Sequence, residues 1–267
     1  MSLPVRLSVP VASAPVPAGR LALDGGRLDV ALNGGLCLAG SHEAHGPAAS
    51  GFALLLALAC PRPGPILWIT DARAPEGHLH GDGIAELGGD PARLWLVAAP
   101  DPLAMLRAAA EAQRCTALGA IVIDTIRPLP ALDLTATRRL QLAAAAHGVF
   151  TLIVRHGPPR PSAALTRWQA DPAPARRLAA GAPGPPRLAI TLARQRGGPA
   201  DVSAILEWNR DRCRFLPAGW AHASPIPIGT VFARRDHRKS GAAVAAAHPG
   251  AGAALPFRPA AAARRAA

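Results

Sequence analysis

The sequence predicts an α/β fold in which helices flank a mainly parallel β-sheet that carries antiparallel strands at one edge. First, short and nearly all-apolar runs alternate with helical stretches, as in parallel sheets whose strands are buried on both faces. Second, Pro and Gly segments take the place of helices between the apolar runs that follow Arg155. Third, a chain of 267 residues with 50% hydrophobic content can bury the core of one large domain.

The parallel strands are expected where residues are apolar over about one strand length. These runs span residues 36–40, 66–70, 94–98, 120–124 and 149–155. Helices are expected between them, at residues 51–60, 82–87, 102–115 and 135–147. Asp101 can cap the start of the third helix, and Gly148 can end the fourth.

The later apolar runs, at residues 165–170, 188–196 and 202–208, are expected to form the antiparallel edge strands. We therefore predict a flexible N-terminal arm over residues 1–20 and a domain over residues 21–208. Residues 209–267 are rich in Ala, Pro and Arg, which predicts a largely disordered tail with a short element near Phe215.

Most of the net charge of +12 lies in this tail, where nine arginines and Lys239 face only Asp211 and Asp236. Such a segment can attract DNA or an acidic partner through non-specific electrostatics. Lys239 is the only lysine of the chain, and there is no tyrosine, which excludes phenol-based acid catalysis.

The chain has no long apolar segment and no Cys-x-x-Cys pair. The apolar run at residues 52–60 is far too short to cross a bilayer, and prolines interrupt the N-terminal 18 residues. We therefore expect a cytoplasmic protein with reduced cysteines.

The most informative motif joins a predicted strand to a predicted helix at residues 46–53. Gly46 and Gly51 have the spacing of the phosphate loop G-x-x-x-x-G-K-[ST], but Phe52 replaces the lysine and Ala53 replaces the hydroxyl residue that binds Mg²⁺. An ordinary strand-to-helix turn is the alternative interpretation. Farther along, the apolar run 120–124 ends in Asp124, where nucleotide-binding folds place a magnesium-binding acid.

Residues 28–36, 46–51 and 120–125 resemble, in order and spacing, the core of RecA-type recombinases, which implies a RecA-like P-loop NTPase fold with a degenerate nucleotide site. More specifically, residues 21–208 resemble the ImuA family. The segments that carry this resemblance are 66–68, 89–94, 132–143, 162–168 and 194–198, of which 132–143 is the most distinctive.

The resemblance implies an accessory protein of SOS mutagenesis that acts in translesion synthesis. The implied partners are ImuB and the error-prone DNA polymerase III alpha-type subunit, with RecA and DNA as further candidates. Three residues replace hydrolytic groups of RecA: Phe52, Ala53 and Arg73. Arg73 occupies the approximate place of the RecA glutamate. We therefore expect a non-catalytic adaptor without cofactor or metal. The alternatives are a divergent DNA-dependent ATPase or recombinase and a SulA-like cell-division inhibitor.

Several residues are candidates for partner or DNA contact. Arginines can meet phosphates, and arginines beside an aromatic residue are common in protein interfaces. The candidates are Arg138, Arg139, Arg155, Arg160, Trp208, Arg210, Arg212 and Arg214. A solvated helix face is the alternative for the first two, and packing of Trp208 into the core is the alternative for the last group.

Two groups of histidines and acids match no recognised metal-ligand spacing, so we interpret them as solvated loops. They are His42, Glu43 and His45, and His78, His80 and Asp82. Ser50 lacks the G-x-S-x-G turn that exposes a nucleophile, which argues against a serine hydrolase.

Overall fold

The computed structural model describes residues 19–24, 26–73, 79–158, 160–176, 178 and 184–217. Most of the predicted N-terminal arm and of the predicted C-terminal tail lies outside these residues, and so does His78. Among the described residues, no helix combines the length and the apolar character that crossing a membrane requires. All four cysteines are described, and none forms a disulfide.

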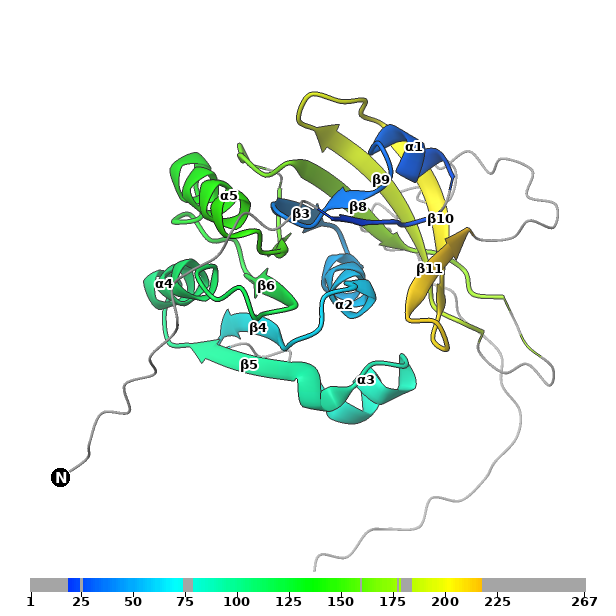
Figure 1. Ribbon diagram of the computed structural model, residues 1–267, viewed down its shortest axis with the longest axis horizontal. Coiled ribbons are helices and arrows are strands. Elements are labelled where there is room, and N and C mark those ends of the chain that lie inside the picture. Colours follow the sequence, from blue (N-terminus) through cyan, green and yellow to red (C-terminus); the bar gives the residue numbers. More distant parts are fainter. Residues whose placement is uncertain are drawn as a thin grey trace, which may run out of the picture. The chain divides into compact units, whose positions relative to one another are not determined.

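A nine-stranded sheet with the order β11-β10-β9-β8-β3-β7-β6-β4-β5 organises the described residues (Figure 1). The strands from β8 to β5 are mutually parallel, and β9, β10 and β11 add antiparallel pairs. The parallel strands are β3 (Ser41–His45), β4 (Ile66–Asp71), β5 (Leu94–Ala99), β6 (Ala120–Asp124), β7 (Thr151–Arg155) and β8 (Thr166–Pro172). The others are β9 (Arg187–Gln195), β10 (Val202–Asn209) and β11 (Arg214–Pro217). The predicted fold class is therefore confirmed, but the prediction that residues 165–170 form an antiparallel edge strand is wrong: β8 runs parallel to β3 and is antiparallel only to β9.

Helices cover both faces of the parallel strands (Figure 1). Ala120 and Val122 of β6 belong to one apolar cluster together with α2 (Ala49–Ala59). Ile121 and Ile123 point the other way, into a second cluster that includes residues of α4 (Pro102–Ala112) and α5 (Leu134–His147). This alternation buries β6 on both faces and explains why its sequence is continuously apolar.

Local sequence signals set the ends of the two long helices α4 and α5. The Asp101 carboxylate accepts a hydrogen bond from the Ala104 amide at 2.8 Å, and Asp133 accepts one from the Ala136 amide at 2.7 Å. Gly148 ends α5 in the left-handed region, with φ of 69°. The roles predicted for Asp101 and Gly148 are confirmed, whereas the cap at Asp133 is an addition.

The strand before the glycine loop was predicted at the wrong place. Residues 36–40 contribute only the short β2 (Leu36–Cys37), which pairs with β1 (Arg20–Leu21), and the central strand is β3. The reason is that β3 carries polar side chains that find buried partners. The imidazole of His42, for example, lies 2.8 Å from Thr166 Oγ1 and 2.8 Å from Cys37 O.

Shorter elements complete the described residues. They are α1 (Arg27–Ala31), α3 (Gly81–Glu86) and the 3-10 helix η1 (Pro91–Arg93). Strand β11 pairs with β10 and lies beyond Trp208, so the folded domain extends to Pro217. Phe215 of β11 is 4% exposed, which identifies this strand as part of the core.

Candidate functional site

Two backbone amides at the glycine loop between β3 and α2 already donate hydrogen bonds to protein oxygens. The Ala48 amide donates to Ala170 O at 3.1 Å, and the Ala49 amide donates to Gly46 O at 3.1 Å. Helix α2 begins at Ala49, two positions before Gly51. Phosphate loops instead present successive free amides to the ligand. Two of the amides of this segment therefore already have protein acceptors.

Gly46 is required by the close approach of the neighbouring strand. Its φ is +105°, and a Cβ atom at this position would lie 2.4 Å from Ala170 O. A Cβ on Gly51 would meet no atom within 4 Å. The first glycine of the motif thus has a packing reason that needs no nucleotide.

The side chain of Phe52 lies in the apolar core, at the motif position of the phosphate-binding lysine. Its exposed fraction is 0%, and its ring centroid lies 5.8 Å from that of Trp168 and 5.9 Å from that of Phe215. Ala53, at the position of the magnesium-binding hydroxyl, is also fully buried. Helix α2 is therefore joined through Phe52 to strands β8 and β11.

Asp124 ends β6 with a carboxylate that already has several protein partners. Ser50 Oγ donates to Asp124 Oδ2 at 2.8 Å, and the Ile126 amide donates to Oδ1 at 3.3 Å. His156 Nε2 lies 3.2 Å from the same Oδ1. The structure thus brings Asp124 next to the glycine motif, as the motif order predicts, and connects it to Ser50 in the first turn of α2.

Arg73 follows β4 at the sheet edge where β6 also ends. Arg127 donates to the backbone oxygen of Arg73 at 3.2 Å and forms an ion pair with Asp71 at 3.3 Å. The guanidinium of Arg127 is therefore already engaged by the end of β4.

Arg155, one of the candidates for DNA contact, is held inside the protein. Its exposed fraction is 5%; Nε lies 3.1 Å from Glu43 Oε2, and an Nη atom donates to Leu132 O at 2.8 Å. Glu43 also accepts a hydrogen bond from Arg167 Nε at 3.0 Å. Since Glu43 is paired with two arginines, it does not belong to a solvated loop, and the interpretation of this segment as a solvated loop is wrong.

Trp208 is also in the core, as its alternative interpretation proposed. Its indole nitrogen donates to Leu87 O at 2.8 Å, and its ring packs edge-on against Phe215 at a centroid distance of 5.2 Å. The arginines that follow it are exposed and lie at or next to the turn between β10 and β11: Arg210, Arg212 and Arg214. The predicted aromatic anchor therefore does not accompany these arginines on the surface.

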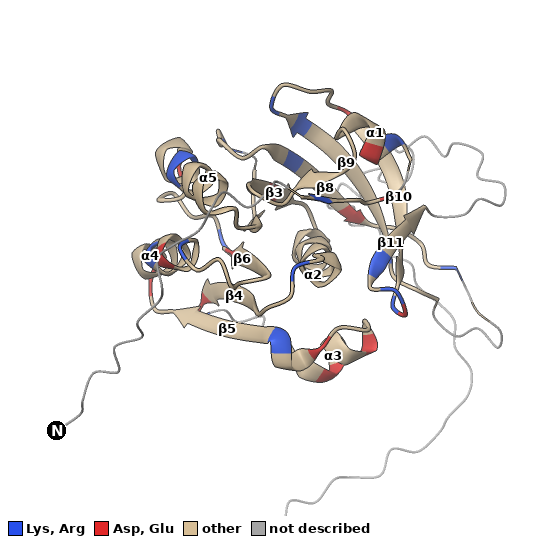
Figure 2. Ribbon diagram, in the orientation of Figure 1, with Lys and Arg blue, Asp and Glu red and all other residues tan. Residues whose placement is uncertain are grey.

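Arg138 and Arg139 are exposed on α5, a helix that carries blue arginine positions in Figure 2. Arg160 is exposed in the segment after β7. Arg138 lines a cavity with Arg194 and Arg196, whereas Arg139 lines a separate groove between α4 and α5. The adjacent arginines of α5 thus belong to two different surfaces.

Within the described part of the chain, no group of three or more His, Cys, Asp or Glu side chains is arranged to hold a metal ion. His42 is buried, and burial lowers its pKa to about 4. Its two ring nitrogens face Thr166 Oγ1 and Cys37 O, so the imidazole serves as a neutral part of the core.

Two groups of residues were missed by reasoning from the sequence. The first is the pairing of Glu43 with Arg155 and Arg167. The second is the aromatic cluster formed by Phe52, Trp168, Trp208 and Phe215. A glutamate placed inside an otherwise regular αβ pattern is a signal for the first group, but nothing local to Phe52 indicates its distant partners.

Comparisons with known proteins bear on the fold and on the family of this chain. No family model matches the sequence. The crystal structure of the RadB recombinase matches with a TM-score of 0.51 and 16% identity, over 72% of this chain and 96% of that chain, and therefore shares the RecA-like fold. Protein ImuA from two strains of Caulobacter vibrioides, NA1000 / CB15N and ATCC 19089 / CB 15, is in each case 33% identical over 237 residues. Each match covers 76% of this chain and 85% of the relative, so the chain belongs to the ImuA family.

Proposed function

We propose that this member of the ImuA family is a non-catalytic, RecA-like adaptor of error-prone translesion synthesis in the cytoplasmic SOS response. Its proposed partners are ImuB and the error-prone DNA polymerase III alpha-type subunit, with RecA and DNA as further partners. The observation that carries this proposal is the full burial of Phe52 in the core, at the motif position of the phosphate-binding lysine.

Loss of ATP hydrolysis follows from what the site lacks. Phosphoryl transfer is catalysed almost entirely by positioning and charge neutralisation, for which the phosphate-loop lysine and a magnesium ion are central. Phe52 and Ala53 supply neither a cation nor a hydroxyl group, and both side chains point into the core. The Asp124 carboxylate has protein partners on both oxygens. These features support an adaptor over a divergent ATPase or recombinase.

The exposed arginines give the proposed adaptor a means to contact DNA. Arg138, Arg139 and Arg160 lie on the domain surface, and the arginines of the turn between β10 and β11 extend this set. Arginines that bind phosphate oxygens position a protein without reading sequence, and their binding weakens as salt increases. Arg155 is left out of the proposed contacts because Glu43 pairs with it in the interior.

Capture of ImuB by the full-length chain tests the adaptor proposal. The matched variant ends at Pro217, because a cut before Arg210 would remove the buried Phe215. We expect the full-length protein to retain ImuB and to release no phosphate from ATP with single-stranded DNA present. Failure of the full-length protein to bind ImuB contradicts the adaptor role. Loss of binding in the shortened chain alone assigns the contact to residues 218–267.

A further inference from the structure

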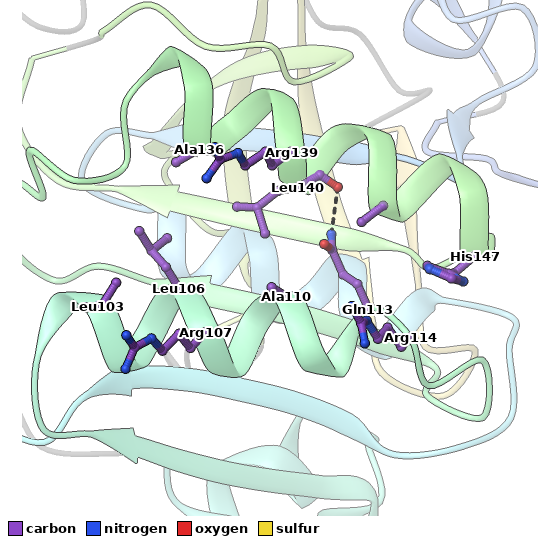
Figure 3. Close-up of a pocket in the computed structure, with 11 residues that line it drawn as sticks. Leu103, Leu106, Arg107, Ala110, Gln113, Arg114, Ala136, Arg139, Leu140 and His147 are labelled. Atoms are coloured by element: carbon purple, nitrogen blue, oxygen red, sulfur yellow. Dashed lines mark hydrogen bonds between the residues drawn. The ribbon is translucent and has the colours of Figure 1, made fainter. Parts of the chain in front are cut away.

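A groove of about 410 Å³ runs between α4 and α5 on the outer side of the domain (Figure 3). Figure 3 shows the two helices side by side and running in the same direction. The groove is lined from Leu103 of α4 to Arg114, just beyond the end of that helix, and from Ala136 to His147 on α5. Each stretch covers about three helical turns, or roughly 16 Å at a rise of 1.5 Å per residue.

The floor of the groove is apolar. Leu106 of α4 and Leu140 of α5 point toward each other across it (Figure 3), and Ala110 and Ala143 keep the space between the helices open. At one end Leu103 leaves 54% of its surface exposed, a large fraction for a leucine beside other apolar side chains. A partner that supplies apolar side chains would remove this surface from water.

The rim of the groove is basic. Arg107 lies on α4, Arg114 lies in the turn that follows it, and Arg139 lies on α5. Glu111 is the acidic side chain paired with this rim, at 3.9 Å from Arg114, and both of these side chains are largely exposed. The groove therefore presents an excess of positive charge around an apolar strip.

Gln113 at the groove adds a polar feature. Its side-chain nitrogen donates to Leu140 O at 2.9 Å and to Thr151 Oγ1 at 3.1 Å. Its oxygen is buried and has no hydrogen-bond partner among the described residues. An unsatisfied buried acceptor is unfavourable, so a donor that reaches it would stabilise a complex.

We propose that this groove binds an acidic amphipathic helix of a partner protein. Leucine-type side chains of that helix would fill the strip between Leu106 and Leu140, and acidic side chains on both flanks would meet Arg107 and Arg139. Helix-in-groove recognition uses apolar anchors at positions i, i+4 and i+7, and this span fits the lined length of α4. The proposal deepens the adaptor function and rests on it, because it assigns a docking surface to that role.

Three other occupants fit the groove less well: the terminal segments of this chain, a second copy of it, and nucleic acid. The N-terminal 18 residues contain Arg6 and no acid, and residues 218–267 contain seven cations and only Asp236, so the groove would repel both segments. A second copy could offer the acidic helix α3 (Figure 2), but its one large apolar side chain, Ile84, is only 2% exposed. Nucleic acid fits the rim but not the floor, which has no aromatic side chain on which a base could stack.

The test measures binding of labelled 14-residue helical peptides to the full-length protein by fluorescence anisotropy. Two peptides share leucines at i, i+4 and i+7 and differ only in flanking glutamates or flanking lysines. The variant Arg139→Glu changes the groove. Arg138→Glu is the matched control, because it makes the same charge change one residue away on a side chain that does not line the groove.

We expect the acidic peptide to bind at least about tenfold more tightly than the basic one, and Arg139→Glu to weaken it about tenfold, as reversal of exposed ion pairs allows. Arg138→Glu should change it by less than about threefold. Absence of binding by the acidic peptide, equal binding of both peptides, or equal loss in both variants overturns the proposal. A single-stranded oligonucleotide that loses binding with Arg139→Glu, while the acidic peptide keeps it, assigns the groove to nucleic acid instead.

Capture of ImuB, run with the same variants, separates the two proposals. If ImuB binds equally to wild type and Arg139→Glu and the peptides do not discriminate, the groove proposal fails and the adaptor proposal stands. If the acidic peptide binds as expected and ImuB is not captured, the adaptor proposal fails and the groove keeps its specificity for acidic helices.

Discussion

Replacing Phe52 by Lys restores the lysine of the phosphate-loop motif. The structure predicts that this change lowers the free energy of unfolding and does not create an ATPase. The Phe52 side chain is fully buried and packs against Trp168 and Phe215. A lysine placed there would direct its ammonium group into an aromatic cluster and not toward a phosphate.

The size of the effect follows from two losses. Truncation of a buried phenylalanine to alanine costs about 3–5 kcal/mol, because apolar contacts are lost and a cavity remains. The lysine stem recovers part of that packing, but its ammonium group loses hydration at a cost of several kcal/mol. We therefore expect both Phe52→Ala and Phe52→Lys to lower the free energy of unfolding by about 4 kcal/mol, a large fraction of the 5–15 kcal/mol typical of a domain.

Urea unfolding followed by tryptophan fluorescence measures this loss, since Trp168 lies against the altered residue. The control is Leu142→Lys on α5, where the leucine is 60% exposed and a change within about 0.5 kcal/mol is expected. If the free energy of unfolding of Phe52→Lys lies within about 1 kcal/mol of the wild-type value, the core role of Phe52 is refuted. Phosphate release gained by that variant would refute the link between Phe52 and the adaptor function.

Two further predictions concern the glycine loop and pH. Gly46→Ala should lower the free energy of unfolding, because the new Cβ would lie 2.4 Å from Ala170 O at a φ of +105°. Gly51→Ala should raise the free energy of unfolding by roughly 0.5–1 kcal/mol, because this helical position is open. Urea unfolding of both variants tests this prediction, and equal effects would contradict it. Because burial lowers the pKa of His42 from 6.5 to about 4, the unfolded chain binds a proton that the folded chain does not, and roughly 3 kcal/mol of stability present above pH 6.5 is lost as the pH falls to 4. Burial lowers the pKa of His45 as well, with the same sign. His42→Gln should flatten this pH dependence, and a pH dependence that His42→Gln does not alter would argue against this cause.

The parallel part of the fold was predictable because its signals are local. The run that forms β6 is apolar at every position before Asp124, and it is buried on both faces as that pattern predicts. Asp101 and Gly148 mark helix ends through contacts within a few residues. Such signals are present in any window of the sequence that contains the element.

The central strand and the filling of the nucleotide loop depend on distant partners. The polar side chains of β3 are tolerated because Glu43 meets Arg167, 124 positions away along the chain. Phe52 is buried partly by Phe215, which comes from a segment whose composition resembles a disordered tail. The sequence shows that a lysine is missing from the loop, whereas only the structure shows what the phenylalanine does in its place.

Phosphate release from ATP by the full-length protein, with single-stranded DNA and ImuB present, tests directly whether this protein lacks ATPase activity. Asp124→Ala is the companion variant, because it removes the acid that would hold magnesium. We expect no release above background for the wild type and no difference between the two proteins. Turnover by the wild type that Asp124→Ala abolishes would contradict this expectation.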